Sequence, residues 1–357
     1  MTMQRLRVLV VEDSVTVRKR LCEVLAADDD LEVVGEATDG HEAIAMCIAL
    51  KPDVITMDMM LPTVTGLAAT EYIMAHCPTP ILVVSSSSNR GEMFRMFDAL
   101  TAGAVDALEK PDGEDDEDWP MRLVSSVKLV ARIRVITHLR GKIGGAPVAK
   151  ARHKPLAASN ARVNCQLIAI GASTGGPGAL VHILNAMVAA LPVPVLVVQH
   201  IGEDFGTAFV EWLNLQVPQK ISYGQEGQAL CHLAGHVLLA PPGRHMLVQH
   251  GRLQLSSGPM RHSCRPSIDI LFESIARECA ASTVACLLTG MGRDGAAGLL
   301  DIRQAGGHTI AQDEASSTIY GMPREAVRLD AAAQVLPLQD IGPALTSMYT
   351  NEQKVQS

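Results

Sequence analysis

Three residues with the chemistry of a hydrolase each lie just past the end of a short apolar run. Ser173 follows residues 167–170, His200 follows residues 193–198, and Asp294 follows residues 283–288. A serine can act as a nucleophile, a histidine as its general base, and an aspartate can orient the histidine. Residues 171–175, GASTG, also have the G-x-S-x-G spacing of a nucleophile on a sharp strand-to-helix turn.

Other interpretations of this turn stay open at the level of residue types. Glycine-rich strand-to-helix turns also bind phosphates, and three residues at strand ends can lie at unrelated corners of a sheet. A Rossmann nucleotide site would need glycine where Ser173 stands, and an acidic residue where Gln199 and His200 follow their strand. The order Ser, His, Asp differs from the order in α/β-hydrolases, which argues against that fold but not against the chemistry.

A second set of reactive residues lies in the first third of the chain. Glu12, Asp13 and Asp58 follow apolar runs, and so do Ser85 and Lys110. Three crowded carboxylates favour a hard cation with oxygen ligands, most simply Mg²⁺. A cation, a lysine and a hydroxyl around one aspartate predict phosphoryl transfer onto that aspartate. The alternative is a solvated acidic loop edge.

The elements that must position these residues alternate along the chain. In the first third we expect strands at 6–11, 31–37, 54–57, 81–84 and 105–108, with helices at 15–27, 40–50, 65–76 and 91–101. In the second half we expect strands at 167–170, 193–198, 237–240, 246–249, 253–255, 283–288 and 309–312, with helices at 179–190, 208–215, 268–281, 295–305, 323–329 and 341–349. This βα alternation predicts α/β architecture: two doubly wound parallel-sheet domains, whose ligands bind at the carboxyl edge of the strands.

The segment between the two domains has a different composition. Residues 119–139 have helical spacing, and residues 141–161 mix Gly, Pro, Ala, Lys and Arg without an apolar period. We therefore expect a domain at 1–125, a helical extension and flexible linker at 126–164, and a second domain at 165–350.

Composition limits the partners and the compartment. The 357 residues carry a net charge of −8 and are 48% hydrophobic but only 3% aromatic, which gives no basic footprint for nucleic acid. No apolar run is long enough to cross a bilayer, and the N-terminus has no signal-peptide pattern, so we expect a cytoplasmic protein. The eight cysteines form no C-x-x-C and are expected to be reduced. A zinc site at Cys231, His232 and His236 is the alternative.

The first domain resembles a response-regulator receiver domain, in the motifs VVEDS, MDMMLP, VSS and EKP of residues 10–14, 57–62, 84–86 and 109–111. The resemblance implies that Asp58 accepts the phosphoryl group from a chemotaxis histidine kinase and that Glu12, Asp13 and Asp58 bind Mg²⁺. Ser85 and Lys110 would contact the phosphoryl group. Ala107 stands where receivers usually carry an aromatic switch residue, so an aromatic rotamer switch is not expected.

The second domain resembles the chemotaxis protein-glutamate methylesterase domain, in the motifs GASTGGPGAL, QHI, RPSID, LLTGMGRDGAAGL and QDEASSTIYGMPREA. The resemblance implies hydrolysis of glutamyl methyl esters on the cytoplasmic helices of methyl-accepting chemoreceptors, with deamidation of receptor glutamines, and no cofactor in this domain. Ser173, His200 and Asp294 would form the triad, and Thr174, Met291 and Arg265 would contact the oxyanion or the substrate. For Arg265, a structural ion pair is the alternative role.

Regulation is expected from the order of the two domains. The unphosphorylated first domain would pack over the Ser173 edge, and phosphorylation of Asp58 would favour an open arrangement. A DNA-binding output domain is the rival, but residues 165–350 offer no basic recognition helix.

Overall fold

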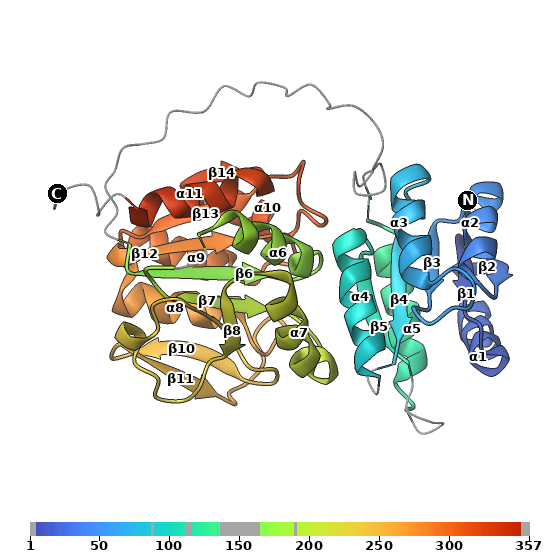
Figure 1. Cartoon of the computed structure of the whole chain (residues 1–357), viewed down its shortest axis with the longest axis horizontal. Coiled ribbons are helices and arrows are strands. Elements are labelled where there is room, and N and C mark those ends of the chain that lie inside the picture. Colours follow the sequence, from blue (N-terminus) through green and yellow to red (C-terminus); the bar gives the residue numbers. More distant parts are fainter. Residues whose placement is uncertain are drawn as a thin grey trace.

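The computed structural model describes residues 5–86, 89–110, 116–133, 135, 165–188 and 191–350. They form two α/β lobes that lie side by side (Figure 1). The expected linker at 141–161 and Pro111 of the EKP motif lie outside the described residues.

The N-terminal lobe is a five-stranded parallel sheet in the order β2-β1-β3-β4-β5. Its strands are β1 (Leu6–Val11), β2 (Leu31–Ala37), β3 (Val54–Met57), β4 (Ile81–Ser85) and β5 (Asp106–Glu109), and its helices are α1 (Val15–Ala26), α2 (Gly40–Leu50), α3 (Gly66–His76), α4 (Arg90–Ala102) and α5 (Trp119–Val130). Ser14 caps α1, because its side chain accepts a hydrogen bond from the N–H of Val17. Helix α5 is shorter than expected: a turn replaces it after Val130.

The C-terminal lobe has a seven-stranded parallel sheet in the order β14-β13-β12-β6-β7-β9-β8. The strands are β6 (Leu167–Ala172), β7 (Val195–Gln199), β8 (Lys220–Tyr223), β9 (His236–Leu239), β12 (Thr283–Leu287), β13 (His308–Gln312) and β14 (Gln334–Leu336). The helices are α6 (Gly176–Ala186), α7 (Glu203–Gln216), α8 (Ile268–Glu278), α9 (Ala296–Gln304), α10 (Met322–Arg328) and α11 (Leu338–Thr350). The α/β architecture with two parallel sheets is therefore as predicted.

Three parts of this lobe depart from the predicted pattern. Strands β10 (His245–Gln249) and β11 (Arg252–Ser256) form a separate antiparallel hairpin instead of extending the main sheet. The edge strands β8 and β14 were not predicted, because each is short and lacks a continuous apolar run. Edge positions of this kind do not need the hydrophobic residues that mark central strands.

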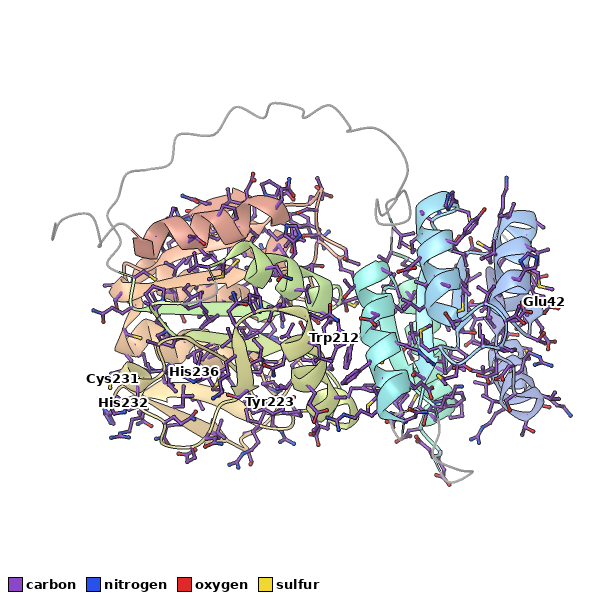
Figure 2. The ribbon with its side chains drawn as sticks, in the orientation of Figure 1. Glu42, Trp212, Tyr223, Cys231, His232 and His236 are labelled. Atoms are coloured by element: carbon purple, nitrogen blue, oxygen red, sulfur yellow. The ribbon has the colours of Figure 1, made fainter. Side chains whose placement is uncertain are left out.

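The two lobes meet where α4 packs against α6 and α7. Phe97 of α4 lies 5.2 Å, centroid to centroid, from the rings of both Phe209 and Trp212 of α7. The indole Nε1 of Trp212 donates a hydrogen bond to Asp98 at 2.8 Å, and Figure 2 shows Trp212 on the side of the C-terminal lobe that faces α4. Buried aromatic rings, this hydrogen bond and an ion pair between Arg90 of α4 and Glu211 of α7 therefore hold the lobes together.

Candidate active site

Strand order brings Ser173 and His200 to neighbouring positions at one sheet edge. Strand β6 is central, and its parallel register with β7 pairs Ala172 with Gln199, so Ser173 and His200 are the next residues along the two strands. The backbone N–H of His200 donates to the Ala172 carbonyl at 3.0 Å. Since adjacent strands lie about 4.8 Å apart, the two side chains leave the sheet side by side.

The turn after Ser173 requires glycine at two positions for steric reasons. Gly175 has φ +78°, a conformation that L side chains rarely adopt. A Cβ on Gly176 would lie 2.0 Å from Oε1 of Gln199. These glycines let α6 begin immediately behind the serine, so the N–H groups of the first helical turn face the region beyond the hydroxyl.

Gln199 is a site residue that the sequence did not single out. It is buried, and its Nε2 donates to the carbonyls of Ser173 and His200, each at 2.9 Å. One amide therefore fixes the backbone of both residues across the gap between β6 and β7. Its place directly before His200 was the available signal, but a lone glutamine has no distinctive chemistry.

The imidazole of His200 is held by Asp294. Nε2 of His200 and Oδ2 of Asp294 are 2.9 Å apart. Asp294 precedes α9 in the chain and is buried against the N-terminus of α8. There it also accepts from Oγ of Ser267 at 2.7 Å and from the N–H of Ile268 at 2.7 Å and of Asp269 at 3.1 Å. The start of α8 thus provides donors at the positive end of a helix, which favour an ionised carboxylate.

The pKa values of His200 and Asp294 are shifted in opposite directions from their ordinary values. Burial acts to lower the pKa of His200, but the hydrogen bond and charge of Asp294, together with Cys264, raise it to about 9. Burial acts to raise the pKa of Asp294, but His200, Ser267 and the N–H of Ile268 bring it below its usual range. The pair therefore favours an imidazolium next to a carboxylate.

The second nitrogen of His200 faces a thiol. Nδ1 lies 3.7 Å from Sγ of Cys264. Within the described residues, no hydrogen bond joins the Ser173 hydroxyl to His200. Since Nε2 is engaged by Asp294, Nδ1 is the atom that can accept a proton from Ser173 when the imidazole of His200 is neutral.

The three weaker candidates have different surroundings. The N–H groups of Thr174 and Met291 donate to no other backbone group in the part of the chain that the structure describes, so both can serve an oxyanion. The Met291 side chain is exposed. Arg265 donates from Nη1 to the carbonyl of Gly258 at 3.3 Å and forms no ion pair with a described residue.

The acidic cluster of the N-terminal lobe has the donors for a hard cation. Oxygen atoms of Glu12, Asp13 and Asp58 lie within 4.8 Å of one another, and Nζ of Lys110 is 3.0 Å from both Glu12 and Asp58. Burial and the charge of Asp58 raise the pKa of Glu12 to about 7, although Lys110 acts in the opposite direction. A carboxylate that resists ionisation here fits a site completed by a divalent cation such as Mg²⁺.

The hydroxyl of Ser85 is engaged by a buried carboxylate of α4. Its Oγ donates to Oε1 of Glu92 at 3.0 Å, and that oxygen also accepts from the N–H of Ser86. Glu92 is buried in the first turn of α4. This carboxylate, which the sequence did not indicate, connects the end of β4 to the helix at the interface.

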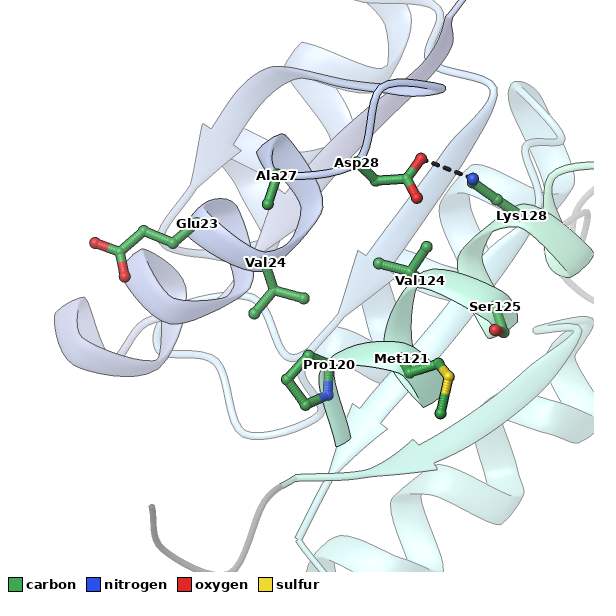
Figure 3. Close-up of a pocket in the computed structure, with 9 residues that line it drawn as sticks. All are labelled: Glu23, Val24, Ala27, Asp28, Pro120, Met121, Val124, Ser125 and Lys128. Carbon is green, nitrogen blue, oxygen red and sulfur yellow. Dashed lines mark ion pairs between the residues drawn. The ribbon is translucent and has the colours of Figure 1, made fainter. Parts of the chain in front are cut away.

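Two other regions do not join these sites. Cys231, His232 and His236 lie near one outer end of the C-terminal lobe in Figure 2, and none belongs to the groups of described residues whose ligand atoms converge. A cavity of about 670 Å³ lies between α1 and α5, beside the ion pair of Asp28 and Lys128 (Figure 3). It is lined by residues of those two helices and by Ala27 and Asp28, which follow α1, and none of the predicted site residues lines it.

Comparisons with known proteins agree over both lobes. Residues 168–345 match the family model for CheB methylesterase, and residues 8–117 match that for the response regulator receiver domain. A protein-glutamate methylesterase/protein-glutamine glutaminase of Nitrosospira multiformis is 40% identical over 347 residues, 96% of this chain and 97% of the relative. One of Anaeromyxobacter dehalogenans is 42% identical over 344 residues, 96% of this chain and 97% of the relative. The crystal structure of the Thermotoga maritima CheB methylesterase catalytic domain is 29% identical, covers 52% of this chain and 98% of that chain, and has a TM-score of 0.49.

Proposed function

Because this chain belongs to the CheB methylesterase family and carries a receiver domain, we propose that Ser173, His200 and Asp294 hydrolyse glutamyl methyl esters on chemoreceptors under the control of Asp58. The activity is that of a protein-glutamate methylesterase/protein-glutamine glutaminase, as in its relatives. The observation that carries the assignment of residues is the bond between His200 and Asp294 beside the strand end that presents Ser173.

The chemistry follows from the atoms at the strand ends. Oγ of Ser173 attacks the ester carbonyl carbon while its proton moves to Nδ1 of His200. The N–H groups of Thr174 and Met291 hold the resulting oxyanion. When the C–O bond breaks, His200 returns the proton to the leaving methoxy oxygen, and methanol departs.

A water molecule completes the cycle by the same route. It attacks the acyl-serine, gives its proton to His200, and leaves a free glutamate carboxyl on the receptor and a restored Ser173 hydroxyl. Asp294 stabilises the imidazolium in both halves of the reaction. With a glutamine substrate, the proton goes to the leaving nitrogen, and ammonia replaces methanol.

The nucleophile is tested by methanol release from methylated receptor. Ser173→Ala should lower kcat by about 10³-fold or more, because members of a triad act as a unit. Ser222→Ala, on the edge strand β8, is the matched control and should keep its activity. A Ser173→Ala protein with a near-normal rate would reject the mechanism.

Control by phosphorylation uses the cluster of the N-terminal lobe. We assign Asp58 as the acceptor from a chemotaxis histidine kinase and Glu12, Asp13 and Asp58 as ligands of Mg²⁺, which would neutralise charge on the transferred group. Lys110 already pairs with Asp58, at 3.0 Å, and is placed to stay with the charge that phosphorylation adds.

The signal to the second domain needs a route other than an aromatic switch, because position 107 is alanine. Phosphorylation gives Ser85 a stronger acceptor than Glu92, so the bond of Ser85 to α4 is expected to break. Helix α4 carries Phe97 and Asp98 against α7. Loss of the Ser85 bond would therefore loosen the contact that places this domain beside the active lobe.

The close approach of the lobes supports an inhibitory contact. A Cβ on Gly178, in the first turn of α6, would lie 3.4 Å from Cα of Thr101 in α4. Helix α6 begins three residues after Ser173, so α4 sits near the edge that a receptor helix must reach.

Glu92→Ala tests this route. The unphosphorylated variant should release methanol faster than the parent, and a phosphodonor should stimulate it less. Glu71→Ala, exposed on α3, is the control and should respond as the parent does. An unchanged ratio of stimulated to basal rate in Glu92→Ala would exclude the route.

The domain limits and the compartment follow the same proposal. We assign residues 1–125 to the receiver, 126–164 to the connecting segment and 165–350 to the methylesterase domain. Among the described residues, no helix has both the length and the apolar character needed to span a bilayer. We propose action in the cytoplasm, where receptor helices and the kinase are accessible.

A further inference from the structure

Cys264 lies next to His200, the proposed base, but the methylesterase mechanism does not use its thiol. Its Sγ lies 3.7 Å from Nδ1 of His200, the nitrogen not engaged by Asp294. Its other contact is with the carbonyl of His262, at 3.4 Å. The His200 side chain is 14% exposed, so an ion from solvent can reach it.

The geometry of this pair matches two ligands of one metal ion. In a tetrahedral zinc site, bonds of about 2.3 Å to sulfur and about 2.0–2.1 Å to nitrogen put the two ligand atoms about 3.5–3.6 Å apart. The observed 3.7 Å between Sγ and Nδ1 needs almost no movement. A thiolate with an imidazole also favours zinc and related soft ions over Mg²⁺.

The other side of the imidazole has the support typical of a metal-bound histidine. Such histidines usually donate their second N–H to a carboxylate, which fixes the tautomer and the ring. Here Asp294 takes that role at 2.9 Å and is itself held by Ser267 and by the start of α8. Nδ1 therefore faces Cys264, and its lone pair points that way once the imidazolium has lost its Nδ1 proton.

Among the described residues, three groups of possible metal ligands converge, and the group of His200, Cys264 and Asp294 is the one that contains a thiol. Two other cysteines, Cys47 and Cys77, lie close together in the N-terminal lobe beside Thr79, with their sulfur atoms 3.7 Å apart. Neither of these cysteines belongs to a group of converging ligands among the described residues, so no histidine with a supporting carboxylate accompanies them.

We propose that Nδ1 of His200 and Sγ of Cys264 bind a divalent transition metal ion, with Zn²⁺ the best match, and that the bound ion inhibits the methylesterase reversibly. On binding, the Cys264 thiol and the Nδ1–H of the His200 imidazolium each release a proton to solvent, and the ion takes the lone pair that is freed on Nδ1. Water or the Ser173 hydroxyl fills the remaining coordination positions. The nitrogen that would accept the Ser173 proton is then occupied. The inhibition rests on the proposed function, whereas the binding of the ion does not.

The experiment uses the full chain in excess Mg²⁺, which occupies the oxygen cluster of the N-terminal lobe. Co²⁺ is titrated first, because a cobalt–thiolate bond gives a charge-transfer absorption that oxygen ligands do not. Zn²⁺ should displace Co²⁺ and abolish the band. Methanol release is then measured over a Zn²⁺ series, with each variant normalised to its own metal-free rate.

Cys264→Ser should remove the cobalt–thiolate band and weaken Zn²⁺ binding by about 10–100-fold or more. Cys77→Ser and Cys231→Ser should keep both the band and the Zn²⁺ inhibition of the parent. Cys264→His supplies a nitrogen in place of sulfur, so it should keep Zn²⁺ inhibition without the thiolate band. This variant also separates loss of a ligand from a general loss of folding.

The outcomes distinguish the inference from the proposed function. A band that follows Cys77 or Cys231, that persists in Cys264→Ser, or that never forms overturns the metal site. A band that requires Cys264, with no effect of Zn²⁺ on methanol release, overturns the inhibition. A band that requires Cys264 in a protein that releases no methanol without metal supports the site and rejects the methylesterase mechanism.

Discussion

Replacement of Gln199 by methionine tests whether the backbone of the two reacting residues is held by one side chain. Methionine has a similar length but no N–H. The substitution therefore removes two hydrogen bonds of 2.9 Å, to the carbonyls of Ser173 and His200. Each such bond contributes about 1 kcal/mol, so we expect the free energy of unfolding to fall by roughly 1–3 kcal/mol.

The effect on activity should be larger than this loss of stability implies. Ser173 and His200 follow different strands, and Gln199 links them at their backbone. A misplacement of about 1 Å between reacting groups can lower the rate by about 10²-fold. We therefore expect kcat for methanol release to fall by about that factor, with KM nearly unchanged because Gln199 is buried.

Gln219 provides a matched control. It is also buried, and its Nε2 donates to two carbonyls, of Leu184 at 2.8 Å and Val188 at 3.3 Å. These carbonyls belong to the end of α6 and the residues after it, away from Ser173. Gln219→Met should cost a similar amount of stability but leave kcat within about twofold of the parent.

The assay compares both variants under the same conditions. Urea unfolding gives the free energy of unfolding, and methanol release with a phosphodonor gives kcat and KM. If Gln199→Met and Gln219→Met lose the same stability and the same activity, Gln199 is only a structural residue. That result would refute the positioning role.

Three further perturbations have signed outcomes. Burial lowers the pKa of His200, but its carboxylate partner outweighs this effect and raises the pKa to about 9. Since the base must be neutral to act, kcat/KM should rise with pH between 7 and 9, and a flat activity profile would contradict this. The stability that the charged pair adds below pH 6.5 should be lost as the pH rises through the same range. Trp212→Phe keeps the ring packing but loses the 2.8 Å bond to Asp98, so basal methanol release should rise by up to about tenfold without phosphodonor, and no rise would argue against an inhibitory interface. Lys110→Met removes the ammonium group 3.0 Å from Glu12, so Mg²⁺ should raise the melting temperature more than in the parent, and a smaller shift would contradict the cation site.

Much of the fold could be predicted because central parallel strands are marked by continuous apolar runs. The runs that became β6, β7 and β12, together with residues 8–11 of β1, are buried on both faces, so few of their residues could be polar. The short edge strands β8 and β14 lack this constraint and were missed. Their place depends on pairing with a neighbour far away in the chain.

The candidate site was predictable where a residue type carries its own chemistry. Ser173, His200 and Asp294 could be proposed because nucleophile, base and carboxylate are recognisable at strand ends. Gln199 and Ser267 were not, because an amide and a hydroxyl gain their importance only from the atoms that they contact.

The sequence by itself determined the α/β units, the strand ends that carry reactive residues, and the family to which both domains belong. Only the tertiary structure decided that β6 lies between β12 and β7, which makes three distant strand ends neighbours. It also decided that Cys264 faces Nδ1 of His200 and that Glu92 holds Ser85. The physical reason is that strand formation depends on local patterns, whereas the partner of a side chain depends on the packing of the whole chain.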